Sequence, residues 1–494
     1  MNVPVCLAWI ASGPLWALFG LALYLLLHLG LCLRIVMQRR PVGESLAWIF
    51  IIFAMPFLGP AAYLVLGELR LGRRRALRAI HIAQPIRELL EELPGRSRVD
   101  WSRTEHRFKS LAEMSWRTIG VPAMGRNHVE LIDSWQQAFA RLIDDIDQAQ
   151  STVHLEFYIW NEGGEADAVA AALGRARARG VVCRVLVDDM GSYRFLRGAQ
   201  AAELRSAGVD VQSALPGGLW RVPFVRIDLR MHRKIVVVDG RIAYTGSLNL
   251  VDPRYFKQDA GVGQWVDAMV RIEGPAVEPL AITFLSDWFV ESDDQADELS
   301  ESGDLRPQPA RGQAIVQVLP SGPGIAGDAV EHVLLTAVYS ARSELVLTTP
   351  YFVPSDPLRM GLVAAARRGV KVIVVVPARV DSRLVRYASR ALQGELMEAG
   401  VRIAAFGDGL LHTKSVTIDG EHCLFGSVNL DPRSFRLNFE ILLAIYDRPF
   451  AERLRALQQS YIDRSELVDL QSFRQRSQLQ QGIESLARLA SPVL

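Results

Sequence analysis

The order of apolar and polar residues along the chain predicts an apolar N-terminal region followed by alternating strands and helices. Residues 13–36 are almost wholly apolar, and residues 45–66 form a second apolar stretch that two prolines and a glycine interrupt. A run of about 20 apolar residues is long enough to cross the hydrocarbon core of a bilayer as a helix. We therefore predict a membrane anchor of two helices within residues 1–69, the second kinked or re-entrant. The alternative is a hydrophobic hairpin packed on the rest of the protein.

Basic residues follow both apolar stretches and bear on the orientation of the chain. Cytoplasmic flanks of membrane helices carry an excess of lysine and arginine. A basic segment beside a span also attracts anionic lipid headgroups. The basic linker at about 70–115 therefore favours a cytoplasmic location for the rest of the chain. The arginines in question are Arg34, Arg39 and Arg40 after the first stretch, and Arg70, Arg73, Arg74, Arg75 and Arg78 after the second.

Beyond the basic linker, one pattern of elements occurs twice. The two copies occupy residues 116–290 and 314–494, and an acidic segment rich in serine and proline, 291–313, separates them. Each copy has an extended apolar stretch, a helix ending at a glycine, a strand, a second helix and a closing hairpin. Alternating strands and helices of this kind predict an α/β fold with a largely parallel sheet. The chain is therefore expected to contain two tandem, pseudo-symmetric domains.

The closing hairpins carry the same polar residues in the same order. MHRKIVVVDGRIAYTGSLN (231–249) and LHTKSVTIDGEHCLFGSVN (411–429) share H-x-K-x-x-x-x-D-G followed by G-S-x-N. Asp-Gly between two apolar runs predicts a two-residue hairpin loop. That loop pairs Val238 with Arg241. Since alternate side chains of a strand share a face, each copy then presents an imidazole, an ammonium, a hydroxyl and an amide together: His232, Lys234, Ser247 and Asn249, and likewise His412, Lys414, Ser427 and Asn429.

Such a surface suits a phosphate group. The lysines and asparagines can hold non-bridging oxygens and offset developing negative charge, and each serine can donate a further hydrogen bond. Displacement at phosphorus needs a nucleophile on one side and a proton donor on the other, so one histidine can attack while the other protonates the leaving oxygen. No metal or other cofactor is required. The motif aspartates, Asp239 and Asp419, belong to the candidate catalytic set, although strand parity favours a turn or salt-bridge role.

The composition narrows the choice of partner. The formal net charge is +1, so the chain lacks the general basic character of a nucleic-acid-binding protein. Four cysteines show no metal-binding spacing. The first copy carries extra residues at 212–230, several of them apolar. They indicate either an ordinary loop packed on the core or an apolar rim that touches lipid.

The two hairpins resemble the paired HxKxxxxD(x6)GSxN motifs of the phospholipase D superfamily, and every motif position matches in both copies. The resemblance extends to bacterial cardiolipin synthases over nearly the whole chain. It is carried by AMPFLGPAAYLVLG (54–67), NLVDPRYFKQDAGVGQWVD (249–267), PSGPG (320–324) and TTPYFVP (348–354). It implies two phospholipase D-like domains with mixed β-sheets flanked by helices, on a multi-pass anchor in the bacterial inner membrane. The oligomeric state is not indicated.

The resemblance also implies a reaction and residue roles. Two phosphatidylglycerol molecules would give cardiolipin and glycerol, with His232 as nucleophile and His412 as acid and then base. In many members a carboxylate near the following strand supports the motif histidine, and Glu440 fits that role for His412. The corresponding position of the first copy is Gly261, which leaves Asp259 as a nearby substitute.

Two other functions are compatible with the motifs. A phospholipase or nuclease would form the same covalent intermediate and use water as the acceptor. A non-catalytic membrane scaffold would carry a degenerate site, but both motifs are intact.

Overall fold

A computed structural model describes most of the chain. The described residues are 4–38, 40, 42–97, 99–103, 106–217, 225–226, 228–294, 305–325 and 328–489. They divide into two compact units, the first comprising Met1–Arg73 with Gly218–Asp228, and the second comprising Arg74–Gly217 with Leu229–Leu494. Residues 218–224 and 227 of the insert expected at 212–230 lie outside the described residues.

The first unit contains one helix of membrane-spanning length among its described residues. Helix α1 (Pro4–Met37) includes the apolar segment Trp16–Met37. The second apolar stretch is divided between α2 (Val42–Ala54), α3 (Leu58–Ala62) and the π-helical turn η1 (Tyr63–Gly67). The 13 residues of α2 extend only about 20 Å, against about 30 Å for a bilayer core.

The second apolar stretch is therefore a broken helical segment rather than one continuous helix. Pro56 lies in the break between α2 and α3, and proline removes the backbone donor that a continuous helix needs. At Gly59 a Cβ atom would lie 2.3 Å from the Ile51 carbonyl oxygen, so a glycine permits α3 to pack back on α2. Leu31, Ile35, Ile52 and Tyr63 form the small core of this unit.

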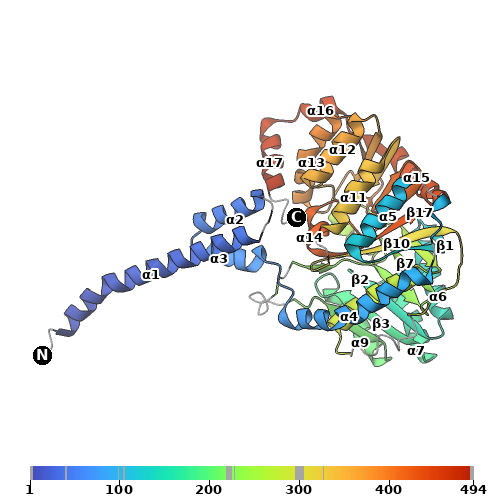
Figure 1. Ribbon diagram of the computed structural model, residues 1–494, viewed down its shortest axis with the longest axis horizontal. Coiled ribbons are helices and arrows are strands. Elements are labelled where there is room, and N and C mark those ends of the chain that lie inside the picture. Colours follow the sequence, from blue (N-terminus) through green and yellow to red (C-terminus); the bar gives the residue numbers. More distant parts are fainter. Residues whose placement is uncertain are drawn as a thin grey trace. The chain divides into compact units, whose positions relative to one another are not determined.

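The second unit is built on one continuous mixed sheet (Figure 1). Its strand order is β18-β13-β12-β11-β15-β16-β17-β10-β1-β9-β7-β6-β2-β3-β4. The first half supplies β1 (Ala123–Ile132), β2 (Thr152–Phe157), β3 (Val182–Asp188), β4 (Asp210–Ala214), β6 (Ile235–Val238), β7 (Ile242–Gly246) and β9 (Met269–Glu273). The second supplies β10 (Ala314–Ser321), β11 (Glu344–Thr348), β12 (Lys371–Pro377), β13 (Arg402–Phe406), β15 (Ser415–Ile418), β16 (His422–Gly426), β17 (Asn438–Tyr446) and β18 (Ser465–Leu467).

The two halves meet at the centre of this sheet, where β1 pairs antiparallel with β10. In each half only three strands run parallel, β2-β3-β4 and β11-β12-β13, and the other pairings are antiparallel. The expectation of a largely parallel sheet is thus wrong, whereas the mixed sheet that the resemblance implied is confirmed. Buried valine, isoleucine and leucine side chains project from both faces of the sheet, which explains why helices cover both faces.

Helices cover the two faces of the sheet, except that the last two helices of the chain pack on another helix. They are α4 (Arg73–Arg96), α5 (His106–Ile119), α6 (Trp135–Gln148), α7 (Glu165–Ala178), α8 (Tyr193–Leu196), α9 (Ala199–Ser206), α10 (Val277–Glu291), α11 (Ala329–Ser340), α12 (Asp356–Arg367), α13 (Arg383–Glu398), α14 (Pro432–Arg436), α15 (Arg448–Asp463), α16 (Leu470–Arg474) and α17 (Gln478–Leu489). Residues 70–115, expected as a linker, include α4 and much of α5. Phe108 and Leu111 of α5 belong to the core of the second half.

The motif hairpins differ from their expected register by one residue. Val238 pairs with Ile242 rather than Arg241, so the loop has three residues, Asp239–Arg241. Asp239 and Gly240 both adopt left-handed backbone angles, with φ of 52° and 60°. The second hairpin repeats this geometry, with Ile418 paired to His422. The wider turn shifts the pairing of the two hairpin strands by one residue from the register that was expected.

Candidate active site

Each motif histidine is delivered by a two-residue strand that pairs with the other half. Strand β5 (Arg230–Met231) runs parallel to β17, and the His232 amide donates to the Phe439 carbonyl oxygen at 2.9 Å. Strand β14 (Leu410–Leu411) runs parallel to β8 (Trp265–Val266), and the His412 amide donates to the Val266 carbonyl oxygen at 2.8 Å. The backbone at each motif histidine is therefore hydrogen-bonded to the opposite half of the second unit.

The carboxylates that support the histidines are exchanged in the same way. His232 Nδ1 lies 2.8 Å from Glu440 Oε2, and His412 Nδ1 lies 2.6 Å from Asp267 Oδ1. The expectation that Glu440 supports His412 is wrong, because β17 is the strand that receives β5. Asp259 does not substitute in the first half: it lies on an exposed 3-10 turn, Gln258–Ala260, and Asp267 takes the role.

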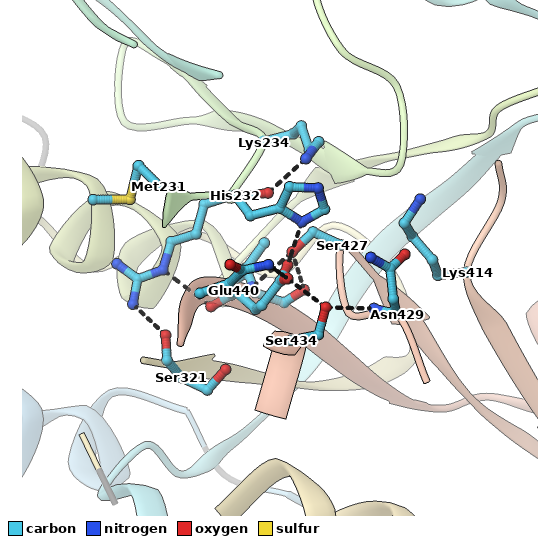
Figure 2. A network of polar contacts seen from close by, with 12 residues as sticks. Met231, His232, Lys234, Ser321, Lys414, Ser427, Asn429, Ser434 and Glu440 are labelled. Carbon is cyan, nitrogen blue, oxygen red and sulfur yellow. Dashed lines mark hydrogen bonds and ion pairs between the residues drawn. The ribbon is translucent and has the colours of Figure 1, made fainter. Parts of the chain in front are cut away.

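The motif serines bind these carboxylates within their own halves. Ser247 Oγ donates to Asp267 Oδ1 at 2.6 Å, and Ser427 Oγ donates to Glu440 Oε2 at 2.5 Å. Figure 2 shows Ser427 and Glu440 against the His232 ring, with Lys234 and Lys414 nearby. The serines, expected to contact phosphate, thus orient the carboxylates instead.

The two carboxylates differ in how many hydrogen bonds they accept. Glu440 Oε1 accepts from Ser434 Oγ at 2.9 Å and from Asn438 Nδ2 at 3.1 Å, so both of its oxygens are occupied. Asp267 Oδ2 is buried and has no hydrogen-bond partner among the described residues. The negative charge of Glu440 is therefore spread over more donors than that of Asp267.

The motif lysines are buried beside the histidines. Lys234 Nζ donates to the His232 carbonyl oxygen and Lys414 Nζ to that of His412, both at 2.6 Å. Burial lowers the pKa of Lys234 to about 8. Burial, together with the charge of Lys234, lowers the pKa of Lys414 to about 7, against the opposing effect of Asp267. Both ammonium groups are close enough to each other to interact, and each can contact an anion bound between them.

Both imidazoles are held neutral with a defined tautomer. Burial and the neighbouring lysines lower the pKa of His232 and of His412 to about 4, despite their carboxylate partners. Burial alone would raise the pKa of Glu440, but His232, Lys234 and Ser427 hold it below its usual value. An ionised carboxylate accepts only, so Nδ1 of each histidine carries the proton and Nε2 keeps a lone pair.

The motif asparagines and two aromatic rings complete the surroundings. Asn249 Oδ1 accepts from the Ile159 amide at 3.2 Å, while its Nδ2 is buried without a partner in the described part of the chain. In Asn429 the buried atom without a partner there is the acceptor Oδ1. Tyr158 lies 4.9 Å from His232 and Trp265 lies 4.3 Å from His412, measured between ring centroids.

The motif aspartates lie at the far ends of the hairpins. Asp239 accepts from the backbone amides of Gln150, Ser151 and Thr152 at 2.7–3.2 Å. Asp419 accepts from three equivalent amides and pairs with Arg107 at 2.5 Å. These carboxylates join each hairpin loop to the start of a neighbouring strand, which is the turn or salt-bridge role that strand parity favours.

The residue between the histidine and the lysine differs between the copies. Arg233 is fully buried, and its guanidinium binds Asp287 and donates to the carbonyl oxygens of Glu440 and Ser321 at 3.0 Å. Nearby Glu156 is also buried, and burial together with Asp287 raises its pKa well above the usual value. In the second copy Thr413 contacts the Tyr461 hydroxyl at 3.2 Å.

Comparison with known proteins agrees with this geometry. A family model described as "Cardiolipin synthase, PLD-like domain" matches residues 142–288 and 334–461. A second, "Phospholipase_D-nuclease N-terminal", matches residues 20–68. The chain is 45% identical to cardiolipin synthase A of Erwinia tasmaniensis over 95% of this chain and 97% of that protein. It is 44% identical to the Serratia proteamaculans protein of the same name, with the same coverage.

Among solved structures, phosphatidylserine synthase of Haemophilus influenzae Rd KW20 has a similar fold. It aligns with a TM-score of 0.58 at 15% identity, over 78% of this chain and all of that one. The two catalytic halves thus form a phospholipase D fold. The chain belongs to the cardiolipin synthase family of phospholipase D-like proteins.

Several expectations from the sequence are confirmed by this membership. The chain is an enzyme of the phosphatidyltransferase class with repeated phospholipase D-like domains, and its substrates are membrane phospholipids. Together with helix α1, the family indicates a bacterial membrane protein.

Proposed function

We propose that the chain joins two phosphatidylglycerol molecules into cardiolipin and glycerol through a phosphatidyl-histidine intermediate. The observation that supports this most directly is the pair of exchanged contacts, His232 with Glu440 and His412 with Asp267. Each contact leaves Nε2 of a neutral imidazole available. Two such imidazoles with two ammonium groups meet the needs of a double displacement at phosphorus.

In the first step, His232 Nε2 attacks the phosphorus of the first phosphatidylglycerol. The N–P bond forms, and the P–O bond to the headgroup glycerol breaks. His412, protonated at Nε2, donates that proton to the departing glycerol oxygen. The bound phosphodiester anion offsets the charge of the lysines that depress the pKa of His412, and so favours its protonation.

In the second step, neutral His412 removes a proton from a headgroup hydroxyl of the second phosphatidylglycerol. That oxygen attacks phosphorus, the N–P bond breaks, and His232 is released as a neutral imidazole. Lys234 and Lys414 contact the non-bridging oxygens in both steps. With the asparagine amides they stabilise the charge of the transition state.

The unequal carboxylates support the assignment of His232 as nucleophile. Glu440 shares its charge among four donors, so it stabilises an imidazolium less and leaves His232 neutral for attack. Asp267 has one oxygen without a donor among the described residues, so it stabilises protonated His412 more strongly. That difference suits His412 to acid–base catalysis.

Turnover of purified protein with labelled phosphatidylglycerol tests the reaction. Cardiolipin and glycerol should form in equal amounts, and quenching with denaturant at neutral to mildly alkaline pH, where the N–P bond survives, should trap label on a peptide containing His232. Phosphatidic acid without cardiolipin would instead identify a hydrolase. Label trapped on His412 would reverse the roles of the two histidines.

We further propose that the catalytic halves are cytoplasmic and that the segment after α1 enters the bilayer without crossing it. The arginines that follow α1 and η1 support this arrangement, and α2 is too short to span. A C-terminal fusion to a reporter that is active only in the cytoplasm should be active. An active periplasmic reporter at the same position would refute the orientation.

A further inference from the structure

Helix α17 turns its apolar side chains away from the protein. Leu479, Ile483, Leu486 and Leu489 recur at helical spacing and are 76%, 43%, 67% and 74% exposed. The buried side of the same helix carries Glu484, which is 1% exposed. A surface helix of a soluble domain normally shows the reverse arrangement, with its apolar stripe facing the core.

Ion pairs fix α17 in this orientation. Glu484 accepts from Arg390 of α13 at 3.0 Å and also pairs with Arg476. Beside it, Ala487 packs on Ala388 and Leu392 of α13. If the helix were rotated to bury its leucines, Ala487 would lose its packing on α13 and Glu484 would be separated from both arginines. These contacts therefore keep the apolar face of α17 directed outward.

Two exposed arginines, Arg383 and Arg386, lie on the first turn of α13. Figure 1 shows α17 alongside α13, and their contacts run antiparallel: Phe473, just before α17, is nearest Gly394, whereas Ala487 packs on Ala388. The C-terminal end of α17 and the start of α13 consequently share one end of the pair, where the arginines gather around exposed Leu384.

That end of the helix pair lies near the active site. Val380, three residues before α13, packs against a cluster that contains Trp265, whose ring centroid lies 4.3 Å from that of His412. The neighbouring Asp381 accepts from the Tyr351 hydroxyl at 2.7 Å and pairs with Lys257 at 3.0 Å.

We propose that the apolar face of α17 lies in the interfacial layer of an anionic phospholipid bilayer and holds the active site at the lipid surface. An amphipathic helix of this composition buries its apolar face about 5–10 Å into the boundary between headgroups and acyl chains. The two arginines of α13 match the negative charge of phosphatidylglycerol. The inference builds on the proposed lipid substrate and identifies how the catalytic unit reaches it.

Spin labels on the full-length protein in vesicles test the contact. Leu486→Cys reports the apolar face and Gln481→Cys the polar side, in a background with Cys6→Ala and Cys32→Ala, since Cys183 and Cys423 are buried. In vesicles of phosphatidylglycerol and phosphatidylcholine, the label at 486 should be more accessible to oxygen than to a water-soluble nickel complex. The label at 481 should show the opposite preference. Nickel access at both positions would overturn the proposal, as would dipolar coupling between labels at 486 of two copies.

An activity measurement separates docking from chemistry. The double variant Leu479→Glu/Leu486→Glu should lose at least about tenfold in turnover on phosphatidylglycerol vesicles, because two charges must then enter the interface. It should keep wild-type turnover on a short-chain phosphatidylglycerol below its micelle concentration. The matched control Gln481→Glu should retain both activities. Wild-type turnover of the double variant on vesicles would refute docking, whereas failure of the wild-type protein to form cardiolipin from either substrate would refute the proposed reaction instead.

Discussion

Glu440, on strand β17 of the second half, accepts a hydrogen bond from Nδ1 of His232 in the first half. His412 and Asp267 form the reciprocal contact. Neither half therefore contains a complete histidine–carboxylate pair, and the pairing depends on the short strands β5 and β14 that each half inserts beside the other.

The Glu440 contact predicts the effect of a near-isosteric change. Glu440→Gln keeps the shape of the side chain but removes the charge that fixes the His232 tautomer. Formation of the phosphatidyl-enzyme in a single turnover should slow by roughly 10²–10⁴-fold. The control is Glu421→Gln, at a carboxylate that pairs only with Arg107 and Arg448 among the described residues, for which we expect no change in rate. Equal rates for the two variants would contradict the role of Glu440.

The buried lysines predict an alkaline limit to activity. Each ammonium carries its charge below its pKa and loses it above, and those pKa values are about 7 for Lys414 and about 8 for Lys234. The value of kcat/KM should therefore fall as pH rises through this interval, and also as pH falls through about 4, where His232 becomes protonated.

Replacing one lysine by arginine tests which group sets the alkaline limit. Arginine stays protonated throughout this range, so Lys414→Arg should shift the alkaline limb of the kcat/KM profile to higher pH. An alkaline limb that does not move in Lys414→Arg or in Lys234→Arg would show that neither ammonium sets it.

The motif aspartates predict a loss of stability without a loss of catalysis. Asp239→Ala leaves three backbone amides without their acceptor and should lower the free energy of unfolding by about 1–3 kcal/mol. Asp239→Asn should lower the free energy of unfolding by less, since asparagine tolerates the left-handed backbone at this position and retains one acceptor. Denaturant unfolding measures both. Turnover lost by Asp239→Asn at unchanged stability would show a catalytic role.

The buried Arg233 predicts a non-additive pair of substitutions. Arg233→Met leaves the Asp287 carboxylate buried without its partner and should destabilise the fold by about 3–5 kcal/mol. Adding Asp287→Leu removes the orphaned charge and should recover part of that loss. A double-mutant cycle of unfolding free energies checks the coupling. Additive effects would mean that the two side chains do not stabilise each other.

The sequence predicted which residues form the site better than it predicted which of them contact one another. The repeated motif identified both histidines, both lysines and the serine–asparagine pairs, because a duplication makes chance agreement negligible. Glu440 was also found, but spacing along one chain cannot reveal that β17 receives a strand from the other half. Its assignment to His412 was therefore wrong.

Asp267 was missed for a related reason. The segment between the motif and its carboxylate is longer in the first half, 250–266, than in the second, 430–439, so counting positions led to Gly261 and Asp259. A usable signal was the run of apolar residues that directly follows each carboxylate, Ala268–Met269–Val270 in one half and Ile441–Leu442–Leu443 in the other. The hairpin register was missed because the Asp-Gly signal predicts a turn but does not fix the pairing beyond it, which joins Val238 to Ile242.

The reciprocal arrangement of the two histidine–carboxylate pairs has an evolutionary consequence. A half-length chain on its own would contain a histidine without its carboxylate and a carboxylate without its histidine. Two identical half-length chains related by a two-fold axis would complete both pairs at once, because such an interface joins the same surfaces in both directions. The antiparallel junction of β1 and β10 has the symmetry of that interface. Fusion of a gene for a symmetric dimer would thus preserve the site unchanged, and leave each copy free to diverge, as Arg233 and Thr413 have done.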